Sequence, residues 1–158
     1  MLATSLRLNV PITLGLIFIT AVLLNYPWEL AQGVLYAGAD YTNGMWSHCF
    51  IASLGDGVMV LIIHMVGWAA FCRRDWFFQH QRGWWVPMIT TGLVLGVAVE
   101  WIAVHLLERW SYTDQMPLVP GLGIGVIPIL QMLILPPFIF AVAAKIMQRL
   151  ISASRPKV

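Results

Sequence analysis

The sequence predicts an all-α polytopic membrane protein, a bundle of four transmembrane helices with both termini on the same side. Of its 158 residues, 59% are hydrophobic and 10% are charged, whereas a soluble domain of this size has about a quarter charged residues. Four apolar runs are each long enough to cross about 30 Å of hydrocarbon. We expect helices over residues 10–36, 47–72, 84–109 and 121–147, which form a single integral membrane domain covering 1–158.

The first run could instead be a signal peptide, because Arg7 precedes it and Ala37-Gly38-Ala39 matches a cleavage site. It is too long for the apolar part of a signal peptide, however, and it contains Glu29 within a polar stripe. We therefore expect it to be a membrane span.

Basic residues predict the orientation, because they concentrate on the cytoplasmic side of a membrane protein. Eight of the nine fall on the side of the termini and the middle loop: Arg7, Arg73, Arg74, Arg82, Lys145, Arg149, Arg155 and Lys157. Only Arg109 lies on the other side. We therefore expect cytoplasmic termini, an outer aromatic belt (Tyr36, Tyr41, Trp46, Trp110, Tyr112) and an inner one (Trp76, Phe77, Phe78, Trp84, Trp85).

Three carboxylates lie inside predicted spans, namely Glu29, Asp56 and Glu100. A charged side chain costs about 2.5–3.5 kcal/mol at the centre of a membrane helix, so those that persist face a bundle interior, a partner or water. Helical spacing places four polar residues on one face of the first helix: Asn25, Glu29, Gln32 and Tyr36. At 1.5 Å of rise per residue, Glu29, Asp56, Glu100 and Gln131 all fall in the outer half of the membrane. The sequence therefore predicts one shared polar pocket.

In that pocket, Glu29, Asp56 and Glu100 are the candidate catalytic residues. The candidate substrate-binding residues are Asn25, Trp28, Gln32, His105, Tyr112 and Gln131. One carboxyl group can stay protonated and act as an acid while another acts as a base, which suits isomerisation, cyclisation or hydration of a lipidic molecule. The alternative is structural: the carboxylates pair with Asn25, Gln32, Gln131 or His105 and hold the helices together.

The histidines and the outer loop leave further alternatives open. His48 and His105 lie near the outer boundary and could join Glu29 or Glu100 around a metal, but no HxxxH, ExxH or HExxH spacing supports a metal site. No haem or dinucleotide motif indicates a cofactor either. The loop after Arg109 is either a lid, with Tyr112 and Asp114 reaching inward, or a tight helix connection.

Three segments carry a resemblance: "NYPWELAQ", "ASLGDG" and "EWIAVHLLERWSYTDQMPLVPGLGIGVIPILQ". With their W-E-x-x-Q, L-G-D and W-x-Y-x4-P motifs, they resemble an uncharacterised family of small four-helix bacterial inner-membrane proteins. The resemblance covers most of the chain and implies an inner-membrane location without an activity. The chain is more loosely similar to small membrane carotenoid and sterol enzymes, which use intramembrane carboxylates. It lacks the P-x-E-E motif of membrane lycopene cyclases, which Pro128 and Gln131 only partly match.

Three functions are compatible with these features. The first is a membrane-embedded acid/base enzyme, or a binding protein, for a lipidic or isoprenoid-like small molecule. The second is a small transporter or a proton or metal pathway, formed as a homo-oligomer, in which His64 extends the polar path inward. The third is an accessory subunit that docks a partner membrane protein. Membrane lipids surround the chain in each case, and no basic stripe indicates nucleic acid.

Overall fold

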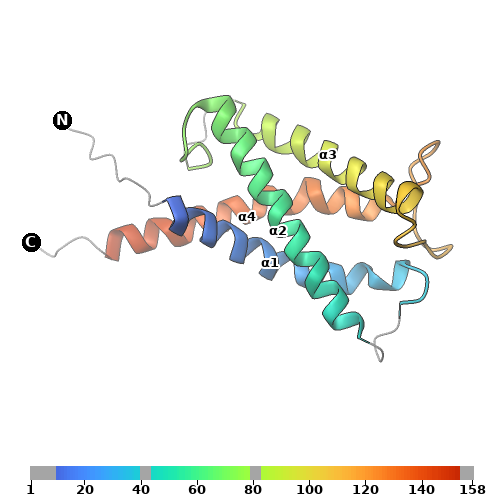
Figure 1. Cartoon of the computed structure of the whole chain (residues 1–158). Coiled ribbons are helices and arrows are strands. Elements are labelled where there is room, and N and C mark those ends of the chain that lie inside the picture. Colours follow the sequence, from blue (N-terminus) through green and yellow to red (C-terminus); the bar gives the residue numbers. More distant parts are fainter. Residues whose placement is uncertain (1–9, 40–43, 79–82, 154–158) are drawn as a thin grey trace, which may run out of the picture.

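The protein is an antiparallel bundle of four long helices, described by a computed structural model over residues 10–39, 44–78 and 83–153. The helices are α1 (Val10–Gln32), α2 (Met45–Phe71), α3 (Trp85–Trp101) and α4 (Val126–Ala153). Short helical turns extend α1 (η1, Gly33–Leu35) and α3 (η2, Ile102–Leu106). The start of α1 and the end of α4 lie at one end of the bundle (Figure 1), which we call the termini end. We call the opposite end the cavity end, because the cavity described below lies there.

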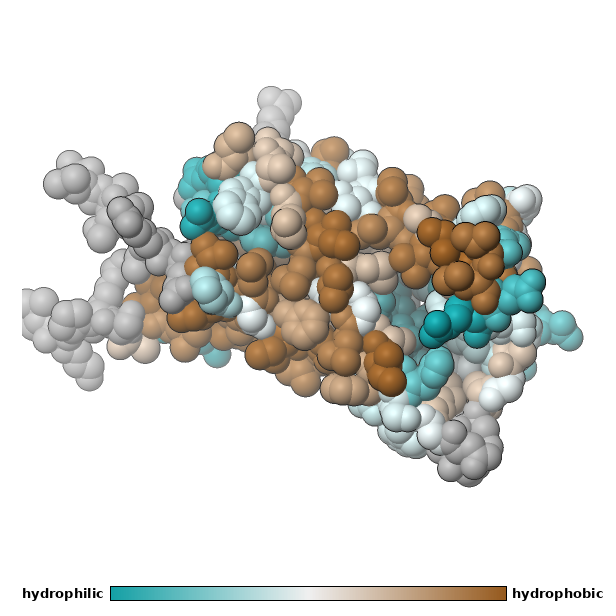
Figure 2. All heavy atoms as spheres, viewed as in Figure 1, coloured by the Kyte–Doolittle hydropathy of each residue, from teal (hydrophilic) through white to brown (hydrophobic). Residues whose placement is uncertain are grey.

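All four helices, with their short extensions, are long and apolar enough to cross a membrane. In the described ranges there is no strand, and the only β-type pairs are the isolated bridges Tyr36–Tyr112 and Leu118–Gly125. The side of the bundle shown in Figure 2 is mainly apolar along the helices. The all-helical fold with four candidate spans is therefore confirmed. Arg7, Arg82, Arg155 and Lys157 lie outside the described residues, as do Tyr41 and His80.

Three helix ends differ clearly from the predicted boundaries, and one of them is the end of the last helix, which continues to Ala153 instead of stopping at residue 147. The last helix begins at Val126 and not near Gly121, because residues 117–126 fold into a compact loop. In that loop the amide of Val126 donates to the carbonyl of Pro117 at 2.8 Å. Gly121 and Gly123 adopt left-handed backbone angles, with φ of 79° and 63°, which end any helical path there. The third helix becomes a π-helical turn at Ile102 and ends at Leu106, short of the expected Arg109.

Glycines bring the helices into two close pairs. Gly57 of α2 lies so near α1 that an added Cβ would come within 2.8 Å of the Phe18 ring. In α3, Gly92 packs against the backbone carbonyl of Met132 in α4. Gly96 lies one turn further along α3, where a Cβ would be 3.4 Å from Ile129 Cα. Small residues at such positions let membrane helices approach closely, so α1 is joined to α2 and α3 to α4.

The core of the termini half is aromatic. The α2–α3 connection folds back so that Trp76 and Phe77 pack on Phe140 of α4, with ring centroids 5.4 Å apart in each case. Trp76 is only 1% exposed, and its indole N–H donates to the carbonyl of His64 at 3.1 Å. Trp76 and Phe77 are therefore core residues, which corrects the prediction that they belong to an inner aromatic belt.

Candidate functional site

Three polar side chains of α1 point into the cavity half of the bundle. Asn25, Glu29 and Gln32 lie at helical spacing, so they share a face, and both Asn25 and Gln32 are buried. Asn25 donates to the carbonyl of Ala21 at 2.8 Å, and Gln32 donates to Glu29 Oε1 at 2.7 Å. The Trp28 indole donates to Gln32 Oε1 at 3.2 Å. These bonds inside one helix hold the polar face of α1 in place.

Gln131 of α4 joins this face to α2. Its side-chain carbonyl accepts from Gln32 Nε2 at 3.0 Å. Its amide nitrogen lies 2.9 Å from Asn25 Oδ1, 2.8 Å from Glu29 Oε1 and 2.9 Å from Asp56 Oδ2. A side-chain amide has two hydrogens, so three acceptors compete for two donors. The Glu29 and Asp56 carboxyl groups also lie within hydrogen-bonding reach of each other.

Glu100 of α3 forms a second polar centre. Its Oε2 accepts a hydrogen bond from the Tyr112 hydroxyl and lies 3.4 Å from the Trp110 indole nitrogen. The Tyr112 oxygen in turn accepts from the amide of Gly125 at 2.9 Å. Glu100 lies just before the π-helical turn of η2, and such turns occur often at functional sites. Two aromatic donors from the α3–α4 connection thus fix one oxygen of Glu100.

A cavity of about 750 Å³ lies between the four helices at the cavity end. Its wall contains Glu29, Asp56 and Glu100 together with Gln32 and Gln131. Figure 2 shows hydrophilic residues in a hollow at this end of an otherwise apolar face. Ligand pockets in proteins have volumes of about 300–1,000 Å³ and mainly apolar walls with a few polar groups. The cavity has the size and the mixed lining of a small-molecule site.

The α3–α4 connection is tied to the end of α1 next to the cavity. The amide of Ala37 donates to the carbonyl of Ser111, and the amide of Thr113 donates to the carbonyl of Leu35, both at 2.9 Å. Burial, followed by the hydrogen bond to Glu100, raises the pKa of Tyr112 well above its ordinary value. Tyr112 thus reaches inward, as expected of a lid residue, whereas Asp114 is exposed.

The predicted site residues separate into three groups. Glu29, Asp56, Glu100, Gln32 and Gln131 line the cavity. Asn25, Trp28 and Tyr112 lie behind them and bond to them directly. His105 lies elsewhere: it is exposed, and its Nε2 is 2.8 Å from the carbonyl of Leu122. The catalytic and binding roles of these residues stay predictions.

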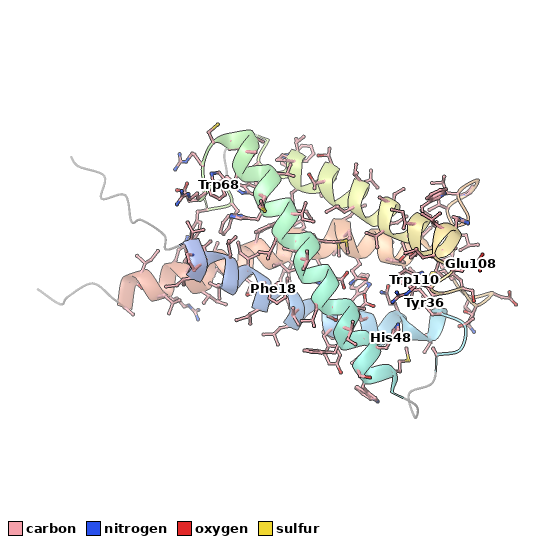
Figure 3. The ribbon with its side chains drawn as sticks, in the orientation of Figure 1. Phe18, Tyr36, His48, Trp68, Glu108 and Trp110 are labelled. Carbon is pink, nitrogen blue, oxygen red and sulfur yellow. The ribbon has the colours of Figure 1, made fainter. Side chains whose placement is uncertain are left out.

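The cavity wall also contains residues that the sequence did not single out for the site: Tyr36, Cys49, Arg109 and Trp110. His48, considered only as a metal ligand, lines it too. Tyr36, His48 and Trp110 lie at the cavity end, whereas Trp68 lies at the termini end (Figure 3). The continuation of the polar stripe of α1 at i+7 from Glu29 was a signal for Tyr36. The sequence predicted Trp110 only as a member of the outer aromatic belt, and nothing in it indicates the contact between Trp110 and Glu100.

Within the described ranges, no group of three or more His, Cys, Asp or Glu side chains is placed to hold a metal ion. The site is instead a carboxyl and amide network beside a cavity. Comparison of the chain with protein families, with curated proteins and with solved structures found no match.

Proposed function

We propose that the protein binds a lipidic, isoprenoid-like small molecule in this cavity, and that Glu29, Asp56 and Glu100 move protons on it. It would do so in the inner membrane of a bacterium, with both termini in the cytoplasm. The observation that supports the proposal is the cavity itself. It lies between apolar helices, yet its wall contains three carboxyl groups from three different helices. Carboxyl groups at such a depth are functional more often than not.

The geometry suits proton transfer. The Glu29 and Asp56 carboxyls share one donor, Gln131 Nε2. Two carboxyl groups this close hold one proton between them more readily than they carry two charges. A protonated carboxyl can donate its proton to a double bond, and a second carboxyl, Glu100 in its ionised form, can remove a proton from a neighbouring carbon. The double bond then moves, no oxidant is needed, and the protons balance.

Two glycines offer a test of the binding step. Gly55 lines the cavity, Gly15 does not, and an added Cβ meets no atom within 4 Å at either position. Native mass spectrometry with lipid extraction would compare wild type, Gly55→Leu and Gly15→Leu. We expect a molecule retained by wild type and Gly15→Leu and lost from Gly55→Leu, because leucine at position 55 takes up space on the cavity wall. Equal retention by both variants would place the bound molecule elsewhere.

The variants Glu29→Gln, Asp56→Asn and Glu100→Gln test the acid/base step, since they keep the size of each side chain and remove its proton chemistry. We expect each variant to retain the molecule extracted from wild type but to convert it at least about a hundredfold more slowly, the usual contribution of a general acid or base. Normal product formation by all three variants would reduce the proposal to binding alone.

The transport alternative has less support. It requires a polar path from Asp56 to His64, but Val60 and Ile63 lie between them on α2 and are fully buried. The His64 ring is packed among Trp76, Phe77 and Phe140. An apolar layer therefore separates the cavity from His64.

A further inference from the structure

The four helices leave one side of the cavity open. Gly57 joins α2 to α1, and Gly92 and Gly96 join α3 to α4. Gln32 and Gln131 join α1 to α4, as do the backbone bonds between residues 35–37 and 111–113. The remaining pair, α2 and α3, lies close at the connection between them and diverges toward the cavity end (Figure 1). Residues of both helices line the cavity along this divergence, among them Gly55 and Val99. On this basis the opening lies between the cavity-end halves of α2 and α3.

The edges of this opening are apolar. Ile51 of α2 and Val99 of α3 both line the cavity, and they are 66% and 39% exposed. Gly55 of α2 is also exposed and on the cavity wall, and an added Cβ there would meet no atom within 4 Å. Apolar residues that line the cavity and stay this exposed suit a passage from the lipid phase.

At the deep end of the cavity, the donors of the network are already used. Both hydrogens of Gln32 Nε2 go to Glu29 and Gln131, and Gln131 Nε2 faces three acceptors. The Trp110 indole, which is also on the cavity wall, has Glu100 as its acceptor. A ligand group that needs a hydrogen-bond donor would find none left among these amides.

Acceptors, in contrast, remain. In the described part of the chain, apart from the contact between the Glu29 and Asp56 carboxyls, no donor is bonded to Glu29 Oε2, Asp56 Oδ1 or Glu100 Oε1. All three carboxyl groups belong to residues on the cavity wall. A buried acceptor is stabilised by a donor and penalised without one. The wall also contains Tyr36, His48 and Arg109, but the part of it formed by the carboxyls favours a ligand group that supplies donors.

We propose that the ligand is an amphiphile whose head group donates hydrogen bonds, a hydroxyl or an ammonium group, and that it enters from the lipid phase between α2 and α3. The head group and the double bond next to it reach the carboxyls, and the rest of the apolar chain stays in the opening beside Ile51 and Val99. This inference rests on the proposed function and specifies the class of ligand.

The test uses three ligands with the same chain: hexadecanol, hexadecylamine and hexadecanoic acid. The protein is reconstituted in nanodiscs of phosphatidylcholine, whose head group has no hydrogen-bond donor, and each bound fraction is measured by native mass spectrometry. We expect the alcohol, the amine or both to bind at least about tenfold more tightly than the acid, since a carboxylate adds acceptors and negative charge. Comparing the bound fractions of the alcohol and the amine shows whether the site prefers a hydroxyl or an ammonium group.

Two valines of α3 test the route. Val99 lines the opening, whereas Val94 is 65% exposed and lies away from the cavity wall. We expect Val99→Trp to slow uptake of the preferred ligand at least about tenfold because the ring narrows the opening. Val94→Trp should take up ligand at the wild-type rate.

Equal binding of the acid would overturn the head-group inference, and wild-type uptake by Val99→Trp would overturn the route. If none of the three ligands binds while wild type still retains an extracted molecule that Gly55→Leu loses, the inference fails and the proposed function stands. If that molecule is also absent, both fail.

Discussion

At the scale of single residues, Tyr112 connects three parts of the site. Its hydroxyl donates to Glu100 at the end of α3, and its oxygen accepts from the amide of Gly125 just before α4. It also pairs with Tyr36 at the end of α1. A hydroxyl that both donates and accepts at a partly buried position is held more firmly than one with a single partner. Tyr112 therefore positions the Glu100 carboxyl relative to the cavity.

The ionisation of Tyr112 can be measured directly. Burial and the bond to Glu100 raise its pKa above the ordinary 10.0, so the folded protein keeps a proton that the unfolded chain releases. Its contribution to stability is thus complete below pH 10 and falls as the pH rises further. Alkaline titration of tyrosinate absorbance should show an equal rise near pH 10 in wild type and Tyr112→Phe, and a smaller rise above it in the variant. A smaller rise near pH 10 in Tyr112→Phe would contradict this assignment.

At the scale of elements, the position of α3 depends on its glycines. Gly92 touches the backbone carbonyl of Met132, which cannot move without displacing α4. The contact sets the distance between α3 and α4, and thereby the place of Glu100 two turns further along α3. The π-helical turn then ends the helix, so that Trp110 and Tyr112 return toward Glu100. The close contact at Gly92 and the end of the helix at the π-helical turn together position Glu100 and its two aromatic donors.

The substitution Gly92→Ala tests the contact, with Gly15→Ala as its control. A Cβ at position 92 would overlap the Met132 carbonyl, whereas one at position 15 meets nothing. We expect Gly92→Ala to lower the free energy of unfolding by about 1–3 kcal/mol, as overpacking does. Gly15→Ala should leave it unchanged or raise it by up to about 1 kcal/mol, because alanine is the better helix former. Thermal unfolding in one detergent would compare them, and equal stability of the two variants would show that α3 and α4 can move apart freely.

At the scale of the whole molecule, the two ends differ in packing. The termini half is filled by an aromatic core around Trp76, Phe77 and Phe140. The cavity half has a polar centre, and α2 and α3 diverge there (Figure 1). A tightly packed base below a cavity would suit the uptake of a molecule from the membrane that we propose.

Cys72 tests how this molecule lies in the membrane. It is exposed at the end of α2, beside Arg73 and Arg74, and we expect it on the cytoplasmic side. In a Cys49→Ser variant, a membrane-impermeant maleimide should label Cys72 in inside-out vesicles and leave it unlabelled in intact spheroplasts. Labelling in spheroplasts would reverse the topology and place the cavity near the inner leaflet.

The sequence alone determined the number of helices and the face on which each presents its polar groups. Four apolar runs predicted four helices, because the length of a span depends on composition along the chain. Counting residues along each helix placed Glu29, Asp56, Glu100 and Gln131 at similar depth, since helical rise is regular. Shared depth explains why all four of these residues line one cavity.

Only the tertiary structure decided which of these groups meet. Depth does not say how a helix is turned about its axis or which neighbour it touches. Depth alone therefore does not predict that Gln131 lies at the centre of the network, or that His105 contacts the Leu122 carbonyl. The start of α4 depended on the glycine loop before it, and the burial of Trp76 on a connection that folds back. The opening between α2 and α3 follows from contacts between helices distant in sequence, which local periodicity does not specify.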